Sequence, residues 1–151
     1  MSQHTARVNW SRTTETMDPK TYTRDHLWTF DSGVVVRASA AAGGPVPAAT
    51  IGPDTVDPEE ALVAALASCH MLFFLALAAK RGLVIDRYED APHGELGTRD
   101  GATSLTTITL EPKVTWHSAP PDAAIVDELH HQAHQRCYIS NSLKSEVVIK
   151  T

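Results

Sequence analysis

The longest apolar stretch of the chain is residues 61–79, which carries no formal charge unless its histidine is protonated. Asp57 precedes it as a helix N-cap, Pro58 takes the first helical position, and Gly82 follows its end. These signals predict a helix that is apolar on every side, which a small domain buries at its centre or between two subunits. The run is just long enough to cross a bilayer. Its alanine content, its Ser-Cys-His interruption and the chain's mean hydropathy of -0.18 favour a buried helix instead.

Alternating apolar and polar positions before this helix predict an antiparallel meander. Strands are expected at 5–11, 21–30 and 34–39, with a tight hairpin turn at 31–33. One face of the second strand carries a cation and an imidazole in line with three aromatic rings: Tyr22, Arg24, His26, Trp28 and Phe30. Residues 40–56 are rich in Gly, Pro and Ala, which predicts a surface loop that leads to the helix.

The pattern after the long helix predicts two strands, a second helix and a closing strand. The first strand is expected at 83–89, with a bend at 91–94 and a continuation at 95–97, and the second at 104–115 after a turn at 100–101. A helix is expected at 122–135, where Val126, Leu129 and Ala133 follow helical spacing and Cys137 extends the stripe, and a strand at 147–149. The order predicts an α+β fold in a single domain, residues 1–151, with a mainly antiparallel sheet over the apolar helix.

Charge and cysteine content narrow the possible functions. The net charge of -5 and the lack of a basic stripe argue against nucleic acid as a partner. The first residues lack the apolar core of a signal peptide, so a cytoplasmic location is expected. In a reducing compartment, two cysteines 68 positions apart are not expected to form a purely structural bridge. They are reduced bystanders, metal ligands or a redox pair.

The two cysteines are the main candidates for chemistry. Cys69 in an apolar helix is often only a small buried hydrophobe. If it is reactive, its activating group must come from elsewhere in the fold, because Glu59 and Glu60 lie ten and nine positions earlier at a rise of about 1.5 Å per residue. Cys137 is a core cysteine or, if the two helices pack together, the partner of Cys69 in a dithiol that can cycle through a disulfide.

A metal site is the rival interpretation. His130 and His134 are spaced i, i+4 and Cys137 follows three positions later, so one helix offers three ligands on adjoining faces. The flanking residues are typical of a solvated helix face, and neither HExxH nor CxxC occurs. We therefore expect no metal.

Two motifs resemble the signatures of the OsmC/Ohr family (osmotically inducible protein C and organic hydroperoxide resistance protein). VDPEEALVAALASCHMLFFLALAAKRGL resembles the family's central helix, in which a reactive cysteine follows a glutamate by ten residues. HHQAHQRCYISNSLK resembles the second cysteine signature. The spacing between the motifs, the hairpin before them and the strand after them agree in order, so the similarity covers essentially the whole chain, in the OsmC-like branch.

The resemblance implies an intertwined α+β homodimer with the long helices at its centre and active sites at its interface. It also implies reduction of organic hydroperoxides, and in some members hydrogen peroxide, in oxidative-stress defence. Carried over by position, Cys69 resembles the peroxidatic cysteine, Cys137 the resolving cysteine, and Glu59 the carboxylate that orients an activating arginine. No bound cofactor is implied. The disulfide is reduced by an external thiol or dithiol, which is a lipoylated protein in the Ohr branch.

The activating arginine departs from the closest family pattern. Arg24 is our choice because it shares a predicted strand face with the aromatic residues and its fork pairs with a carboxylate while donating to a thiolate. Arg37 is the alternative, and the counted position falls near His26. We expect a pocket for alkyl peroxides, although core packing is the commoner fate of such side chains; its candidate residues are Phe73, Phe74, Trp28 and His70, with Met71 and Phe30. The alternative function is a non-catalytic OsmC-like dimer that binds a small apolar ligand or a metal.

Overall fold

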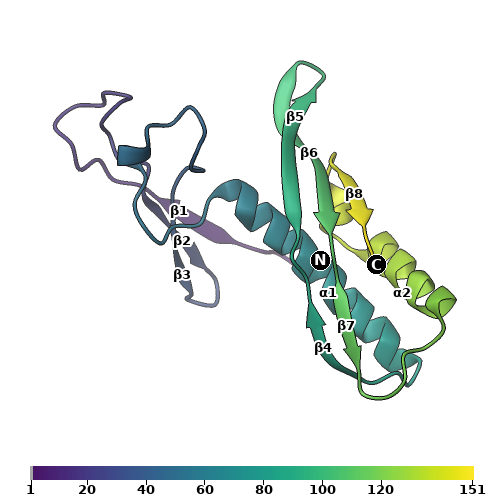
Figure 1. The fold of residues 1–151 in the computed structure, drawn as a ribbon. Coiled ribbons are helices and arrows are strands. Elements are labelled where there is room, and N and C mark those ends of the chain that lie inside the picture. Colours follow the sequence, from purple (N-terminus) through teal and green to yellow (C-terminus); the bar gives the residue numbers. More distant parts are fainter. Residues whose placement is uncertain (1) are drawn as a thin grey trace. The chain divides into compact units, whose positions relative to one another are not determined.

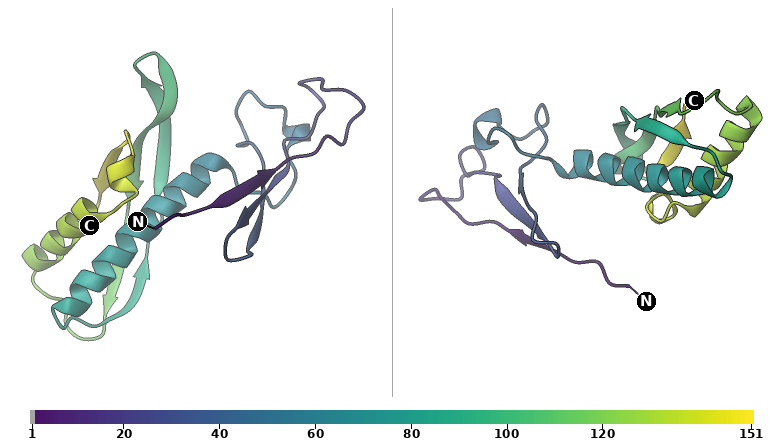
Figure 2. Two further views of the ribbon diagram at one scale, coloured as in Figure 1. Left: turned by 180° about the vertical axis from the view of Figure 1, so that it is seen from behind. Right: turned by 90° about the horizontal axis from the view of Figure 1, so that it is seen from below.

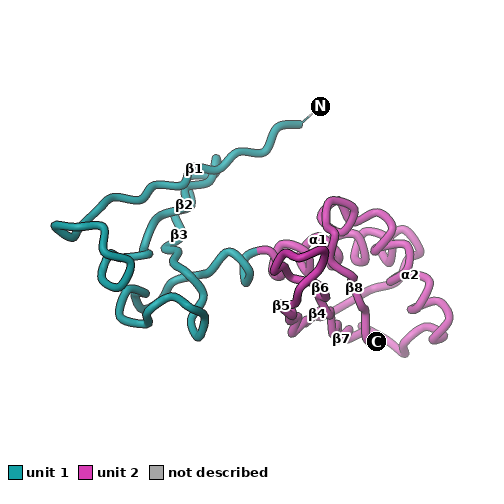
Figure 3. The backbone as a smooth tube through the Cα atoms, turned by 90° about the horizontal axis from the view of Figure 1, so that it is seen from above, with its two compact units in different colours: residues 1–61 teal, residues 62–151 magenta. Residues whose placement is uncertain are grey.

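The chain comprises two compact units. The computed structural model describes residues 2–151, which divide into two units at the boundary between Ala61 and Leu62 (Figure 3). The long helix α1 (Pro58–Lys80) begins in the first unit and continues through the second. The expectation of a single domain over residues 1–151 is not tested by this division and stays a prediction.

The first unit is built on a three-stranded antiparallel sheet (Figure 1). Its strands β1 (Ala6–Asn9), β2 (His26–Phe30) and β3 (Val35–Ala38) pair in sequence order, as predicted. The predicted turn between β2 and β3 is confirmed, with Gly33 at φ 85°, a conformation that glycine adopts without steric cost. The following loop contains a single 3₁₀ turn, Ala48–Thr50.

The prediction of a strand over 21–30 is wrong for its first half. The amides of Thr21 and Tyr22 both donate to the Asp18 carbonyl, and the Arg24 amide donates to the Thr50 carbonyl at 2.8 Å. These backbone groups have therefore found partners in a turn and a loop, so they do not join the sheet. Tyr22 and Arg24 consequently do not continue the face of β2.

The helix α1 begins and ends where its local signals predict. The Glu60 amide donates to Asp57 Oδ1 at 2.8 Å and the Asp57 amide donates to Glu60 Oε2 at 3.2 Å, which is a capping box. At the other end Gly82 takes φ 72° and the Leu83 amide donates to the Ala78 carbonyl at 3.1 Å. By length and composition α1 could cross a membrane, a test that the core helix of a soluble protein also passes.

The second unit contains two small sheets (Figures 1 and 2). In one, β4 (Ile85–Glu89) pairs antiparallel with β7 (Lys113–Trp116). In the other, β6 (Ala102–Leu110) pairs antiparallel with β5 (His93–Arg99) and parallel with the closing strand β8 (Glu146–Ile149). The sheets are thus mainly antiparallel, as predicted.

The predicted number of strands in this unit is wrong, because both predicted long strands divide in two. The bend is at 90–92, and β5 belongs to a different sheet from β4. The expected strand 104–115 is interrupted at Glu111 and Pro112. The Glu111 amide donates to Asp90 Oδ1 at 2.8 Å, and Pro112 has no N–H for a sheet partner. The chain therefore leaves one sheet and enters the other at this point.

The helix α2 (Ala123–Arg136) packs beside α1 against the sheets (Figure 2). Its predicted apolar stripe is confirmed, because Leu129, Ala133 and the capping residue Cys137 are all wholly buried. The core has two clusters. One joins α1 to β6 and the end of α2, through Leu66, Ala67, Ile108, Leu110 and Cys137. The other joins α1 to α2, β4 and β7, and contains Phe74, Leu77, Ala78, Leu129 and Ala133.

Candidate functional site

The two cysteines meet between the helices of the second unit. Cys69 lies in the middle of α1, and Cys137 is the C-cap of α2, where the backbone has left the helical conformation. Cys69 is half-buried and packs against the cluster that contains the wholly buried Cys137. Both thiols are free. The structure thus brings together the two residues that the sequence selected for redox chemistry.

The two thiols have unequal surroundings. Burial, with a smaller contribution from the neighbouring Cys69, raises the pKa of Cys137 to about 11. The Ser140 amide, which donates to Cys137 Sγ at 3.3 Å, acts in the opposite direction but does not offset the burial. Cys137 is therefore a protonated thiol at neutral pH, which suits a second reactant better than a first nucleophile.

An apolar groove of about 440 Å³ opens beside Cys69. Its lining is made of Ala65, Ser68, Cys69, Leu72, Phe73, Ala76, Tyr138 and Ile139. Leu72 is 60% exposed and Tyr138 is 73% exposed, and the Phe73 and Tyr138 rings meet edge to face at 5.2 Å. The lining of this groove is mostly apolar and includes the Cys69 thiol.

The predicted pocket residues lie in different places. Phe73 lines the groove, whereas Phe74 is wholly buried and packs against Tyr88, Trp116 and His130. His70 is also buried, with Nε2 at 3.0 Å from His130 Nδ1. Trp28 belongs to the first unit, as does Phe30. The part that each of them takes in substrate binding stays a prediction.

Arg24 lies in the first unit, in a hollow of about 540 Å³ lined by Val8, Trp10, Met17, Tyr22, Arg24, His26, Ser39, Ala40 and Pro58. Its guanidinium donates to the Tyr22 carbonyl at 2.5 Å and the Pro19 carbonyl at 2.7 Å. The guanidinium carbon also lies 3.5 Å from the centre of the Tyr22 ring, a cation–π contact. Arg24 is therefore held in a defined position with some of its five N–H donors already used.

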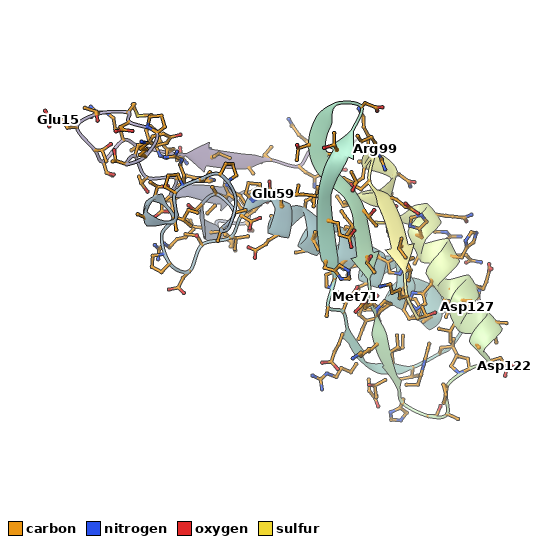
Figure 4. All side chains as sticks on the ribbon, turned by 45° about the horizontal axis from the view of Figure 1, so that its top comes forward. Glu15, Glu59, Met71, Arg99, Asp122 and Asp127 are labelled. Atoms are coloured by element: carbon orange, nitrogen blue, oxygen red, sulfur yellow. The ribbon has the colours of Figure 1, made fainter. Side chains whose placement is uncertain are left out.

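The other residues considered for activation of Cys69 are His26, Arg37 and Glu59. The Trp28 indole donates to His26 Nε2 at 3.0 Å, so His26 carries its hydrogen on Nδ1, which donates to the Arg24 carbonyl at 2.8 Å. His26 therefore supports the backbone of Arg24 through a hydrogen bond. Arg37 is exposed on β3. Glu59 lies half-buried in the first turn of α1, where Figure 4 labels it. The roles of Arg24 and Glu59 stay predictions.

The alternative three-ligand metal cluster does not assemble. His130 points its Nδ1 at His70, while His134 Nδ1 lies 3.2 Å from the Ser140 hydroxyl. Among residues 2–151, no group of three or more His, Cys, Asp or Glu side chains is placed to hold a metal ion. The i, i+4 spacing of the two histidines therefore serves other contacts.

Comparison with known proteins settles the family. The model of the OsmC-like protein family matches residues 52–151. An OsmC-like protein of unknown function from Vibrio cholerae is 40% identical, with a TM-score of 0.90 over 99% of each chain. The chain belongs to the OsmC-like family. A comparison with proteins of curated function gave no match.

More distant structures share the OsmC-like fold. An organic hydroperoxide resistance protein OsmC from Legionella pneumophila is 17% identical, with a TM-score of 0.66 over 99% of this chain and 95% of that chain. The organic hydroperoxide resistance protein OhrB of Bacillus subtilis is 21% identical, with a TM-score of 0.64 over 99% and 96%. At these identities the likeness establishes the fold alone.

Two features of the OsmC-like site were not found from the sequence. Leu72 and Tyr138 line the groove, although neither was singled out. Their positions could have indicated them, because Leu72 is three residues after Cys69 and Tyr138 directly follows Cys137. The pairing of His70 with His130 was also missed, because a contact between residues sixty positions apart leaves no local pattern.

Proposed function

We propose that this OsmC-like protein is a thiol-dependent peroxidase that reduces organic hydroperoxides to alcohols. The observation that carries the proposal is the meeting of two thiols of different exposure, Cys69 and Cys137, beside an apolar groove. Cys69 lines the groove and is open to a substrate there, whereas Cys137 is buried in the cluster against which Cys69 packs. Membership of a family whose fold occurs in organic hydroperoxide resistance proteins agrees with this chemistry.

The proposed reaction has two steps on the protein. The Cys69 thiolate attacks the terminal peroxide oxygen, the O–O bond breaks, and the alkoxide leaves as the alcohol after taking a proton. Cys69 is then a sulfenic acid, oxidised by two electrons. The Cys137 sulfur attacks it, the Cys137 proton leaves with the sulfenic hydroxyl as water, and a disulfide forms. Because Cys137 is protonated until that moment, it does not compete for the peroxide.

The activating groups in this proposal are Arg24 and Glu59, assigned by resemblance. An arginine beside a thiolate lowers the thiol pKa and polarises the O–O bond, and a carboxylate that pairs with the guanidinium fixes its fork. The contacts of Arg24 with two carbonyls leave further N–H donors for such a role.

We further propose an intertwined homodimer, a cytoplasmic location and an external thiol or dithiol reductant, such as a lipoyl group. The groove side of α1 is apolar and in part open to solvent, which supports a second copy as its cover. The substrate is a small hydroperoxide that this groove admits, and no bound cofactor takes part.

Cysteine variants test the enzyme proposal directly. Cys69→Ser is expected to lower peroxide turnover by at least about 10³-fold while the fold is kept, because it removes the nucleophile. Cys137→Ser is expected to consume one equivalent of cumene hydroperoxide and then stop at the Cys69 sulfenic acid, which dimedone labels. Ala64→Ser, at an exposed position of α1 outside the groove lining, is the matched control. Full turnover by Cys69→Ser would contradict the proposal.

The apolar groove also favours a second function, the non-catalytic binding of a small apolar ligand. In that case Cys69→Ser leaves binding of a fluorescent apolar probe unchanged, and wild-type protein does not consume peroxide. Consumption of one equivalent of peroxide per Cys69 argues for the enzyme.

A further inference from the structure

A buried pair of histidines joins the two helices that carry the cysteines. His70 on α1 and His130 on α2 are exposed by only 1% and 4%. Their Nε2 and Nδ1 atoms lie 3.0 Å apart, and their ring planes differ by 1° with centres 5.4 Å apart. Since the nitrogens are much closer than the ring centres, the rings meet edge to edge. This is the geometry of a direct N–H···N hydrogen bond.

The pair lies almost wholly in an apolar environment. His70 Nδ1 is buried without a hydrogen-bond partner, and Phe74 stacks on the His130 ring at 4.2 Å. The charged or titratable groups that act on the pair are both on α2: His134 on His70 and Asp127 on His130; Figure 4 labels Asp127 on this helix. On the sheet side, Tyr88 of β4 packs against Phe74. Removing one partner of such a buried hydrogen bond leaves the other nitrogen unpaired, which lowers the stability of the fold.

The pair and the two thiols connect the same two helices. His70 follows Cys69 directly on α1, and His130 precedes Cys137 by seven positions, which is two turns of α2 and therefore the same face. Apolar contacts let packed helices slide, whereas a hydrogen bond fixes the distance and direction between two atoms. A disulfide tolerates only a narrow range of Cα separation, so a small slide would prevent its closure.

We propose that the His70–His130 hydrogen bond is a positioning contact that holds α1 and α2 at the spacing at which Cys69 and Cys137 close a disulfide. In this role His70 acts through the spacing of the helices and not by contact with the peroxide. The inference deepens the proposed function, because it concerns the dithiol step of that same site.

The test measures the disulfide equilibrium in glutathione buffers, without peroxide. Oxidised glutathione and the two protein thiols give the protein disulfide and two reduced glutathione molecules, so the equilibrium constant reports how well the fold presents the thiols to each other. His70→Leu is expected to lower this constant about tenfold, equal to about 30 mV for a two-electron couple. The double variant His70→Gln/His130→Asn replaces the ring contact with an amide contact and is expected to recover most of the loss.

Two further variants separate positioning from stability. His70→Leu/His130→Leu leaves no unpaired nitrogen in the core and is expected to fold but to keep the weakened disulfide. Leu129→Ala, also in the α1–α2 core, is expected to lower the unfolding temperature while the glutathione equilibrium stays at the wild-type value. Both are compared by circular dichroism and thermal unfolding.

The outcomes distinguish this inference from the peroxidase proposal. The positioning role would be overturned if the folded His70→Leu variants kept the wild-type equilibrium constant for the disulfide. It would also be overturned if Leu129→Ala lowered that constant as much as they do. Neither result would affect the peroxidase proposal. Failure of the wild-type protein to form a Cys69–Cys137 disulfide at any glutathione ratio would overturn both. A disulfide that depends on the histidine pair in a protein that consumes no peroxide would support the inference and remove the peroxidase.

Discussion

The two sides of α1 are equally apolar in sequence but differ in what they contact. One side carries Leu66, Phe74 and Ala78, which are wholly buried against the sheets and α2. The other carries Ala65, Ser68 and Leu72, which line an open groove, and Leu72 is 60% exposed. Within the second unit, therefore, only one side of α1 is buried. The apolar character of the other side is available for a ligand or a second copy, with Cys69 at the border between them.

The largest difference between the two sides is expected in stability. Phe74→Ala removes a wholly buried ring that contacts His130, Tyr88 and Trp116. We expect it to lower the free energy of unfolding by about 3–5 kcal/mol, through lost burial and the cavity left behind. Urea unfolding followed by circular dichroism measures this. A loss below about 1 kcal/mol would show that the buried side is not the core of the fold.

The buried side is also expected to be sensitive to acid. Burial, with the nearby imidazoles, lowers the pKa of His70 from 6.5 to about 4, and burial lowers that of His130 to about 4. The unfolded chain thus binds these protons first, so the stabilisation is complete above about pH 6.5 and is lost as the pH falls toward 4. The loss is about 3 kcal/mol for each histidine at 1.36 kcal/mol per pKa unit.

The matched control for this pH dependence is the variant His70→Gln/His130→Asn. Its unfolding free energy should fall less than that of the wild type between pH 7 and pH 4.5, because carboxylates contribute equally to both proteins. Parallel curves for the two proteins would show that the histidine pair is not desolvated.

The smallest effect on stability is expected on the groove side. Leu72→Ala should change the free energy of unfolding by less than about 0.5 kcal/mol, because the side chain is mostly exposed. It should raise the KM for cumene hydroperoxide several-fold and leave the KM for hydrogen peroxide unchanged, since it removes only apolar contact with the substrate. Equal effects on both substrates would mean that the groove does not bind the organic group.

Local signals explain which parts of the fold were predictable. The bounds of α1 follow from Asp57, Glu60 and Gly82, whose effects act within one turn of the helix. The division at Pro112 was missed because an apolar alternation continues past it, and only the contact with Asp90 reveals the change of sheet. The failure at 21–25 has the same origin, since the partners of that backbone lie in a loop.

The candidate site divides in the same way. Both cysteines were identified from their sequence contexts, but their meeting depends on how the helices pack. Phe73 and Phe74 were predicted to share one apolar pocket, but only Phe73 lines the groove. Phe74 points to the buried side, because neighbouring residues on a helix point about 100° apart. His130, considered as a metal ligand, instead binds His70, and only the tertiary structure shows that choice.

The most direct test of the central claim is the mass of the reduced protein after one equivalent of cumene hydroperoxide, followed by peptide mapping of the thiols. The account predicts a loss of about two mass units that maps to a Cys69–Cys137 bond, because the fold holds both thiols in contact. Two thiols that stay reduced, or that oxidise slowly to higher acids without a bond between them, would contradict the dithiol cycle.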